Sequence, residues 1–260
     1  MTGLTDRDSL TEHQYRDASN LEARIRLHRD FSTNPYPFHR WYFDRLDLPA
    51  TAHVLEVGAG SGALWRENAD RIPPGWELTL TDLSPGILAD ARRSLTGLHA
   101  RFAVADAQAL PFSDASFDAV LANHMLYHVP DRRRAIAEFR RVLQPGGRLY
   151  AATNGEGHLQ ELRDLLAEYV TDMPMRGGWD FGLDDGAAQL RASFRDVVLY
   201  RYDDAFRITQ AEPLKAYIRS MGDYWHIPET RRAELDRRIE DLVARGPFHI
   251  GKEAGMFVAW

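Results

Sequence analysis

The sequence predicts an α/β protein built around a doubly wound, mostly parallel β-sheet. Short apolar segments alternate with segments of helical periodicity over residues 53–153. Turns that contain glycine or proline separate the two kinds of segment. Because a parallel strand–helix–strand unit almost always forms a right-handed crossover, this alternation predicts a sheet covered by helices on both faces.

Five apolar segments have the length and composition of buried strands. In chain order they are residues 53–57, 78–80, 101–104, 117–122 and 148–153. The clearest helix between them is predicted over residues 132–143, where the apolar positions share one face. Asp131 can cap the first turn of this helix, and the Pro-Gly-Gly sequence at residues 145–147 ends it.

Three regions outside this alternation predict a helical cap on the sheet. Near the amino terminus, Asn20 can cap a helix. Further on, an amphipathic stretch precedes a loop rich in glycine, methionine and tryptophan, and we expect this region to open and close over a ligand. The predicted organisation is an N-terminal helical cap at residues 1–50, a core at 51–154, a lid segment at 155–183 and, at 184–260, the end of the core sheet with a helical insertion at about 206–247.

The composition favours an ordinary globular protein. Apolar residues make up 44% of the 260 positions and charged residues 27%, which allows one well-packed core and argues against disorder. No segment approaches the roughly 20 apolar residues of a membrane span, and residues 1–17 lack the basic-then-apolar order of a signal peptide. With no cysteine, disulfides and thiolate chemistry are excluded. We therefore expect a cytoplasmic protein with no membrane partner.

The charge pattern argues against a nucleic-acid partner. The net charge is −6, whereas binding to phosphate backbones requires clustered positive charge. Arginines do cluster at residues 132–134, 140–141 and 231–232, but no aromatic residues interleave with them. Each cluster lies in a segment with helical periodicity, so we predict that these arginines form solvent-facing sides of helices.

The strongest local motif is VLEVGAGSG at residues 54–62. A buried strand runs into Gly58, Gly60 and Gly62 and then into a helix that begins near Ala63. Because glycine has no side chain, the backbone can turn sharply and approach a ligand closely, with amide donors and the helix N-terminus facing it. The motif leaves the ligand class open, since it also satisfies the dinucleotide pattern G-x-G-x-x-G/A.

A second candidate is Asp82, which ends the second strand twenty residues after Gly62. A carboxylate at this position can accept hydrogen bonds from both hydroxyls of a ribose, as it does in dinucleotide-binding enzymes. Asp82 could instead cap the helix that starts at Pro85, and the two roles are compatible. Asp82 therefore supports a ribose-containing ligand without choosing its class.

A third motif distinguishes the ligand classes. VADAQALPF at residues 104–112 follows the third strand, and SDASFD at residues 113–118 leads into the fourth. An acidic residue there, with an exposed backbone amide beside it, can bond the exocyclic amine and a ring nitrogen of adenine. Ordinary dinucleotide dehydrogenases have no counterpart of this block, which argues against an NAD(P) oxidoreductase.

Five motifs lie in register over residues 50–154: LEVGAGSG, LTDLS, DAQALPFSDASFD, ANHMLYHV and LQPGGRLYAAT. Together they resemble the class I S-adenosylmethionine-dependent methyltransferases, particularly the subgroup related to ubiquinone/menaquinone-biosynthesis enzymes. The resemblance implies a Rossmann-like methyltransferase fold whose seven-stranded sheet has one antiparallel member among its last two strands. It also implies S-adenosyl-L-methionine as cofactor and S-adenosyl-L-homocysteine as product.

The resemblance assigns roles to cofactor-binding residues by position. These residues are Glu56, Gly58, Ala59, Gly60, Gly62, Asp82, Leu83, Asp106, Ala107 and Asn123. The glycines would pass beneath the cofactor, and Glu56 would orient the loop and the methionine amino group. Asp82 would hold the ribose, while Asp106 and the Ala107 amide would contact adenine. Asn123 would lie near the transferred methyl group. Glu56 could instead be a purely structural acceptor for the loop.

Candidates for catalysis follow the fourth strand. Methyl transfer mainly requires alignment of donor and acceptor, and a neutral hydroxyl or ammonium acceptor must also lose a proton. His124 and His128 lie at the carboxyl edge of the predicted sheet, and their spacing predicts that both share one helical face. We expect a base with a pKa near the histidine value of about 6.5. His128 could instead be a packed or capping histidine. No metal site is predicted, because the H-E-x-x-H pattern and a third ligand are absent.

An acceptor pocket is expected in the cap. Aromatic and polar residues that could line it are Tyr15, His28, Trp41, His158, Trp179 and Trp225. The NPYP sequence at residues 34–37 is similar to the Asn-Pro-Pro-Tyr motif of enzymes that methylate amide or adenine nitrogen. Because it precedes the first strand instead of following the fourth, it predicts a turn between two cap helices.

The function predicted from these observations is methyl transfer to an O, N or C atom of a small-molecule acceptor, for example in specialised metabolism. A peptide- or protein-modifying methyltransferase is an alternative within the same class. A methyltransferase-like fold that catalyses a cyclisation or isomerisation with S-adenosylmethionine as a bound cofactor is an alternative of a different class. Retained methyl transfer distinguishes the first two from the third.

Overall fold

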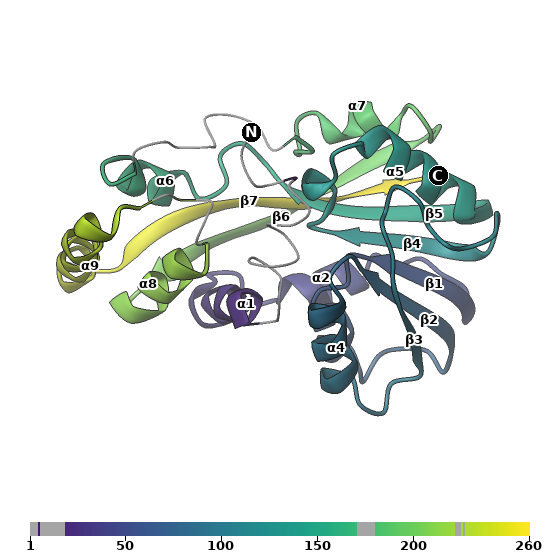
Figure 1. Ribbon diagram of the computed structural model, residues 1–260, viewed down its shortest axis with the longest axis horizontal. Helices are drawn as coiled ribbons and strands as arrows, with labels where there is room; N and C mark the ends of the chain where they lie inside the picture. Colours follow the sequence, from purple (N-terminus) through teal and green to yellow (C-terminus); the bar gives the residue numbers. More distant parts are fainter. Residues whose placement is uncertain (1–4, 6–18, 171–179, 222–224, 226) are drawn as a thin grey trace.

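The computed structural model describes residue 5 and residues 19–170, 180–221, 225 and 227–260. Its strands are β1 (Thr51–Val57), β2 (Gly75–Asp82), β3 (Ala100–Val104), β4 (Phe117–Asn123), β5 (Leu143–Asn154), β6 (Val197–Ile208) and β7 (Phe248–Ala259). They form one sheet of seven strands in the order β3-β2-β1-β4-β5-β7-β6 (Figure 1). β7 runs antiparallel to β5 and β6, and the pairs among the first five strands are parallel. The predicted doubly wound, mostly parallel sheet is therefore confirmed.

Helices cover both faces of this sheet. They are α1 (Ser19–Phe31), α2 (Phe38–Phe43), α3 (Ala63–Glu67), α4 (Pro85–Ser94), the 3-10 helix η2 (Leu126–His128), α5 (Arg132–Val142), α6 (Gln160–Ala167), α7 (Gly186–Leu190), α8 (Ala211–Ser220) and α9 (Glu229–Ala244). α5 and α7 pack on one face, whereas α2 and α3 pack on the other. Because side chains alternate along a strand, Leu55 and Val57 join the first layer and Val54 joins the second. Burial on both faces explains why the strands are continuous apolar segments in the sequence.

The helix predicted after the fourth strand is α5. The Asp131 side chain accepts a hydrogen bond from the Arg134 backbone amide at 3.0 Å, which confirms the predicted cap. The prediction that the Pro-Gly-Gly sequence ends this helix is wrong. α5 ends at Val142, and the next residue, Leu143, already belongs to β5 and pairs with Phe117 of β4. The Pro-Gly-Gly sequence instead lies at an irregularity in the β4–β5 register. Regular pairing resumes on either side of it, at Phe117 with Leu143 and at Ala119 with Arg148.

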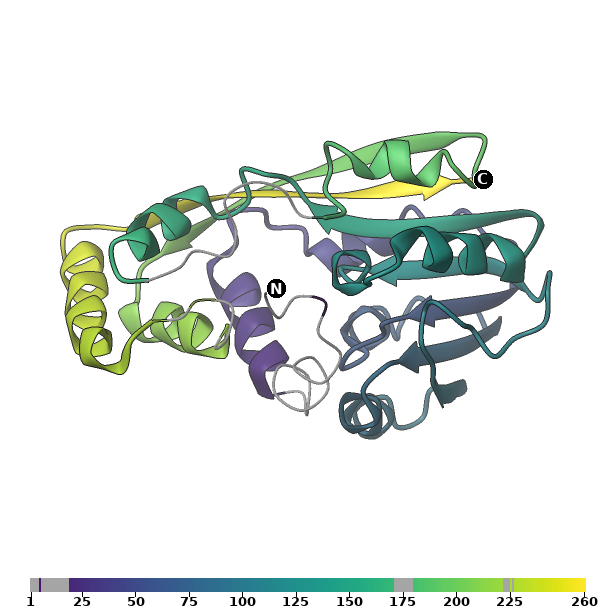
Figure 2. The same cartoon turned by 45° about the horizontal axis from the view of Figure 1, so that its top comes forward.

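The cap is built on an extension of the sheet. β6 and β7 continue past the other strands to α8 and α9, as Figures 1 and 2 both show. A third apolar cluster fills this extension and includes the buried residues Leu27 of α1, Leu162 of α6, Leu214 of α8 and Ile250 of β7. The predicted amphipathic stretch is confirmed as α6. Residues 171–179 of the expected lid and most of the first 18 residues lie outside the described residues, so the lid and the domain boundaries stay predictions.

The helix predicted near the amino terminus is α1, but Asn20 does not cap it. Ser19 is already helical, so Asn20 lies within α1 and not at the position before it. The predicted turn between two cap helices is confirmed, because residues 34–37 separate α1 from α2. None of the helices formed by the described residues combines the length and the apolar composition of a membrane span.

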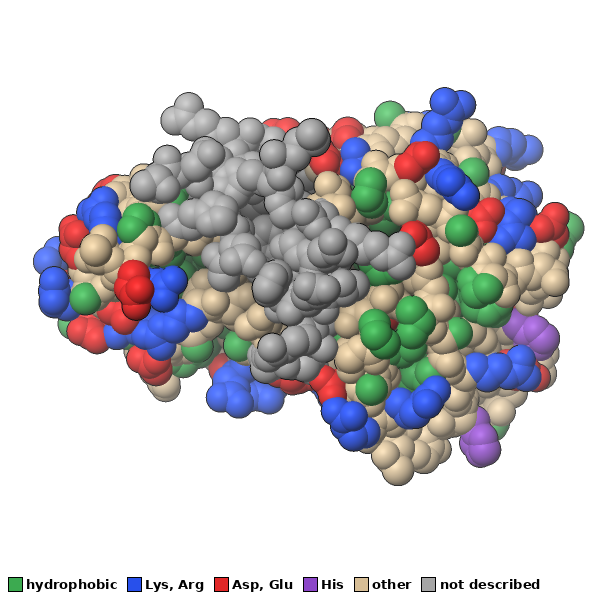
Figure 3. Space-filling view, viewed as in Figure 1, with side chains coloured by type: hydrophobic (Ala, Val, Ile, Leu, Met, Phe, Trp, Pro, Cys, Tyr) green, Lys and Arg blue, Asp and Glu red, His purple; other side chains and the backbone are tan. Residues whose placement is uncertain are grey.

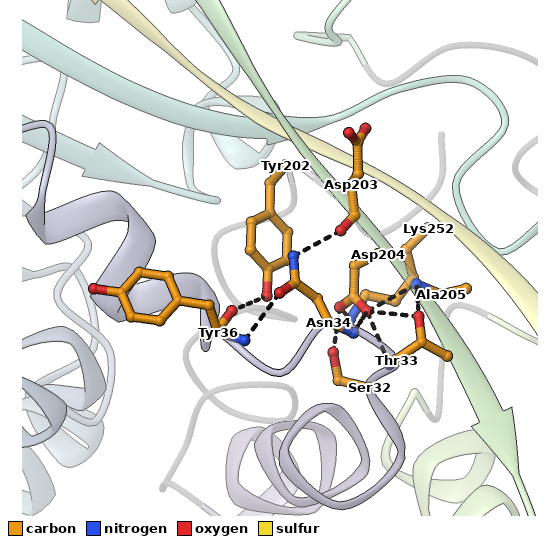
Figure 4. A network of polar contacts seen from close by, with 9 residues as sticks. All are labelled: Ser32, Thr33, Asn34, Tyr36, Tyr202, Asp203, Asp204, Ala205 and Lys252. Carbon is orange, nitrogen blue, oxygen red and sulfur yellow. Dashed lines mark hydrogen bonds and ion pairs between the residues drawn. The ribbon is translucent and has the colours of Figure 1, made fainter.

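A buried ion pair fixes the α1–α2 connection to the sheet (Figure 4). Lys252 of β7 pairs with Asp204 of β6, and their side chains are only 4% and 1% exposed. The same carboxylate accepts hydrogen bonds from the Ser32 hydroxyl at 2.5 Å and from the backbone amides of Thr33 at 3.1 Å and Asn34 at 3.0 Å. One carboxylate thus joins two strands of the sheet to the chain that leaves α1.

A second set of hydrogen bonds attaches the turn at residues 34–37 to β6. The Asn34 side-chain amide donates to the Asp203 carbonyl at 2.8 Å, and its oxygen accepts from the Tyr36 amide at 2.9 Å. The Tyr202 hydroxyl donates to the Tyr36 carbonyl at 2.6 Å. The NPYP sequence is therefore held against β6 by specific side chains, and this places α1 and α2 relative to the core.

The arginine clusters lie on helix surfaces among acidic side chains. Arg141 of α5 pairs with Glu138 at 2.7 Å, and Arg231 of α9 pairs with Glu234 at 3.1 Å. On the face seen in Figure 3, basic and acidic side chains are interspersed over both regions. This arrangement agrees with the prediction of solvent-facing helix surfaces.

Candidate functional site

The glycine-rich loop connects β1 to α3 through three left-handed backbone positions. Gly58, Gly60 and Gly62 have φ values of 75°, 54° and 74°, which favour glycine. The approach of neighbouring groups is close as well, because a Cβ added at Gly58 would lie 2.8 Å from the Met125 Cβ. The predicted sharp turn and the helix start at Ala63 are confirmed.

The expectation that the loop amides face a ligand is wrong for four of them. The amides of Gly58 and Ala59 both donate to the Thr81 carbonyl, at 2.8 and 2.9 Å. The Gly60 amide donates to the Asp82 carboxylate at 3.0 Å, and the Gly62 amide donates to the Ala59 carbonyl at 3.0 Å. The loop folds back on the end of β2, whose acceptors satisfy three of these four donors. At its three glycines, the loop therefore leaves room for a ligand to approach the backbone closely.

Glu56 lies at the carboxyl end of β1 and is 2% exposed. Its carboxylate accepts a hydrogen bond from the Trp65 indole N–H at 2.5 Å and lies 3.5 Å from the Asn123 side-chain amide. Burial raises the pKa of Glu56 to about 8, although the Trp65 and Asn123 bonds oppose this shift and the Asp82 charge adds to it. Trp65 was not predicted from the sequence, although a buried tryptophan generally requires a hydrogen-bond partner.

Asp82 lies at the carboxyl end of β2, the strand that pairs with β1. One carboxylate oxygen accepts from the Gly60 amide and the other from the Ser84 amide, each at 3.0 Å. Burial raises the pKa of Asp82, and these backbone bonds oppose the shift. The alternative role as a helix cap is wrong, because Ser84 caps α4 by accepting from the Ile87 amide.

The end of β3 brings the predicted adenine-contacting residues next to Asp82. The Ala105 amide donates to the Asp82 carbonyl at 3.0 Å. Asp106 then forms a tight turn in which its carboxylate accepts from both the backbone and side-chain amides of Gln108, at 2.9 and 3.0 Å. Ala107, within that turn, is buried. Leu83, the other residue assigned to this region by position, lies between β2 and α4 and is partly buried.

His124 and His128 do not share a helical face. His124 follows β4 in a left-handed conformation with φ 49°, and its amide donates to the Ala152 carbonyl at 3.0 Å. His128 lies in the short helix η2, with its ring 4.5 Å from that of Tyr127. The chain turns away from the sheet at His124, so a helical spacing does not apply to the pair. His124 is therefore next to the site, whereas His128 has the surroundings of a packed histidine.

Burial keeps the His124 imidazole neutral. Burial, together with smaller contributions from the charges of His39, Lys252 and His128, lowers the pKa of His124 to about 4. The expected pKa of about 6.5 is therefore wrong, because that value applies to a solvated imidazole. The ring lies 5.3 Å from the Phe38 ring of α2, so a cap helix covers it.

Comparison with known proteins agrees with this geometry. Residues 55–151 match the methyltransferase domain family. The malonyl-acyl-carrier-protein O-methyltransferase of Geobacter sulfurreducens is 36% identical to this chain over 201 residues, which make up 75% of this chain and 74% of that protein. The chain belongs to the class I S-adenosylmethionine-dependent methyltransferases. It is an enzyme of this family, and its cofactor is S-adenosylmethionine.

Further similarities agree with the predicted subgroup and fold. A ubiquinone/menaquinone biosynthesis C-methyltransferase of Bordetella avium is 44% identical over 98 residues, 37% of this chain and 38% of that protein. Phosphoethanolamine N-methyltransferase 2 of Haemonchus contortus, solved with S-adenosylmethionine, has a TM-score of 0.61 at 20% identity, covering 100% of this chain and 60% of that one. The cyclase SpnF has a TM-score of 0.53 at 22% identity, covering 85% and 79%. These structures show the shared fold.

The residues of this methyltransferase fit its cofactor. The Ser61 hydroxyl of the glycine-rich loop and the Asn123 side-chain oxygen are buried and have no hydrogen-bond partner among the described residues. Buried polar atoms are seldom left unpaired unless a ligand or water satisfies them. The Asn123 side chain lies beside Glu56, so the carboxyl ends of β1, β2 and β4 present the side-chain oxygens of Glu56, Asp82 and Asn123 as acceptors to a ligand with hydroxyl and amino groups.

The predicted acceptor-lining residues of this methyltransferase fall into four groups. His28 of α1 and His158 after β5 lie near Lys252: burial and that charge lower the pKa of both, the pKa of His158 to about 3. Trp41 is a packing residue, with its ring 5.2 Å from that of Tyr202. Trp225 is 4% exposed, and its indole nitrogen has no partner among the described residues. Tyr15 and Trp179 lie outside the described residues.

Sequence reasoning did not find Phe38, whose ring packs on His124, or Lys252 near His28 and His158 and its partner Asp204. Lys252 is one of only two lysines in the chain and lies in a mostly apolar terminal strand. Such a lysine requires a buried carboxylate partner. That signal is present in the sequence, but it does not identify Asp204 among the many acidic residues.

Proposed function

We propose that this methyltransferase transfers a methyl group to an O, N or C atom of a small-molecule acceptor. The observation that carries the proposal is a neutral, partly buried imidazole, His124, directly after the Asn123 side chain that faces Glu56. The names of similar proteins support a small acceptor and include O-, C- and N-methyltransferases.

The proposed cofactor-binding residues bind different parts of S-adenosylmethionine. Each Asp82 oxygen keeps a lone pair after its backbone bond, so the carboxylate can accept the ribose hydroxyls. Asp106 and the Ala107 amide bind adenine, while Glu56 and Asn123 bind the amino-acid part. When bound, S-adenosylmethionine supplies a methyl group that its sulfonium makes electrophilic. The protein then has to align the acceptor and exclude water.

His124 orients the acceptor or takes its proton. A neutral imidazole has one nitrogen that can accept a hydrogen bond from a hydroxyl or amine. The Phe38 ring and the cap hold this group out of bulk water, which strengthens the contact. His28, His158 and Trp225 provide further polar groups on the cap side for binding the acceptor.

Cofactor binding tests the first part of the proposal. Isothermal titration is expected to show micromolar binding of S-adenosylhomocysteine and no binding of NADH. Asp82→Ala is expected to weaken S-adenosylhomocysteine by about 10- to 100-fold, the effect of losing hydrogen bonds to a charged group. Asp118→Ala is the matched control, because that carboxylate also accepts a backbone amide, from His53 at 2.8 Å, but at the opposite edge of the sheet. Equal affinity of both variants would place the ribose elsewhere.

Acceptor identity is tested with S-adenosylmethionine labelled in its methyl group. The panel contains hydroxylated, amino and carboxylated small molecules, free and linked to a carrier protein, and unrelated peptides. Label in a small molecule is the expected result. Label in peptides alone would favour the protein-modifying alternative. A rearranged, unlabelled product that forms only with the cofactor present would favour the cyclase-like alternative.

A further inference from the structure

Trp65 places an indole N–H against the carboxylate at the end of β1. Its side chain is fully buried in the core layer of α2 and α3. The N–H donates to the Glu56 carboxylate at 2.5 Å. Because a close-packed ring of this size has few alternative orientations, the direction of the N–H is fixed by the core. The orientation of Glu56 is therefore fixed by α3, the helix that follows the glycine-rich loop.

Trp65 provides the shorter of the two hydrogen bonds that the Glu56 carboxylate accepts from the described residues. The only other described hydrogen-bond donor to the carboxylate is the Asn123 amide, at the limiting distance of 3.5 Å. The titratable groups that face Glu56 are Asp82 of β2 and Tyr42 of α2, and the Tyr42 hydroxyl donates to the Tyr150 carbonyl instead. No lysine or arginine among the described residues forms an ion pair with Glu56. An indole donor thus orients the carboxylate without neutralising its charge.

We propose that Trp65 is a positioning residue for the cofactor: its indole N–H holds the Glu56 carboxylate ready to bind the ammonium group of S-adenosylmethionine. The proposal rests on the cofactor-binding role of Glu56 in the proposed function. An arginine in place of Trp65 would also orient Glu56, but it would compete with the cofactor for the negative charge. A neutral donor leaves that charge to the ligand.

This arrangement couples cofactor binding to a proton. Burial holds the pKa of Glu56 at about 8, so the carboxyl is largely protonated in the free protein at pH 7. An ammonium group favours the ionised form, and binding therefore releases the proton. The Trp65 bond also favours the ionised form, so its loss moves the pKa of Glu56 upward. Proton release then persists to higher pH.

Titration calorimetry of S-adenosylhomocysteine in buffers of different ionisation enthalpy measures this release. The parent enzyme is expected to release close to one proton at pH 7, with a decline around pH 8. Trp65→Phe is expected to move the decline upward by about one pH unit and to weaken binding at pH 7 by about tenfold. Since the ligand is the same, its own titration cancels in the comparison. Trp76→Phe is the matched control: Trp76 is also buried and donates to the Pro49 carbonyl at 2.9 Å, away from the site.

A second measurement does not depend on the folding of Trp65→Phe. One indole N–H signal in the ¹⁵N spectrum of the parent enzyme is expected to move with pH around 8 and on addition of S-adenosylhomocysteine. Glu56→Gln should abolish the pH response and the proton release. Absence of any such signal, or an unchanged decline in Trp65→Phe, would overturn the role of Trp65. Failure of the parent enzyme to bind S-adenosylhomocysteine would instead overturn the proposed function.

Discussion

Replacing His124 by alanine is expected to lower turnover by about 10²- to 10⁴-fold, the usual contribution of a general acid–base group. S-Adenosylhomocysteine should bind nearly as tightly as before, because the predicted cofactor contacts come from Glu56, Asp82 and Asp106. Single-turnover rates with labelled cofactor, together with calorimetric affinities, measure the two effects separately. A loss confined to turnover indicates that His124 acts on the acceptor.

The pH dependence follows from the depressed pKa of His124. With a pKa of about 4, the imidazole is neutral and able to accept a proton at every pH above about 5. His124 therefore contributes no change in rate between pH 6 and 8, and its contribution is lost only as the pH falls towards 4. A rate that rises through pH 6.5 would mean that the imidazole is solvated in the working enzyme.

His128→Ala is the matched control for this experiment. The His128 ring packs edge-on against Tyr127 within η2, so its loss should affect stability more than rate. Near-normal turnover in His124→Ala would show that alignment alone suffices or that His28 takes the proton. Equal losses of turnover in His124→Ala and His128→Ala would indicate that the substitutions change the conformation of the chain after β4. The loss could then not be assigned to a general base at His124.

The sequence predicted the parts of this fold that depend on local pattern. The alternation of strands and helices, the left-handed glycines after β1 and the Asp131 cap of α5 each follow from residues close together in the chain. Glu56 and Asp82, the two carboxylates predicted to bind the cofactor, lie at the ends of the neighbouring strands β1 and β2. Parallel strands bring such residues to the same edge of a sheet.

The missed features depend on pairing between distant segments. Asp204 and Lys252 are 48 positions apart, and only the β6–β7 register places them opposite each other. The environment of His124 is likewise set by Phe38, which arrives from a helix that precedes the first strand. Burial by such a helix changes the pKa of a histidine by more than its sequence neighbours do. The periodicity of the sequence predicts neither the β6–β7 register nor the burial of His124.

Asp204→Ala is expected to lower the free energy of unfolding by about 3–5 kcal/mol, the usual cost of removing one partner from a buried ion pair. The change leaves the Lys252 ammonium without its carboxylate and the Ser32, Thr33 and Asn34 donors without their acceptor. Urea unfolding at pH 7 measures the loss. Asp203→Ala is the matched control, because Asp203 is the exposed neighbour on the same strand and uses only its backbone carbonyl in this network.

The pH dependence of this stabilisation provides an independent check. Burial disfavours ionisation of Asp204, but the bonds from Lys252 and Ser32 outweigh it and keep its pKa below the ordinary value. The contribution is therefore complete above the unfolded pKa of about 3.9 and is lost as the pH falls through the lower folded value. A double variant, Asp204→Leu with Lys252→Met, should regain part of the stability, because it buries no unpaired charge. If Asp204→Ala is no less stable than Asp203→Ala, the α1–α2 connection is held to the sheet by its apolar contacts and not by this carboxylate.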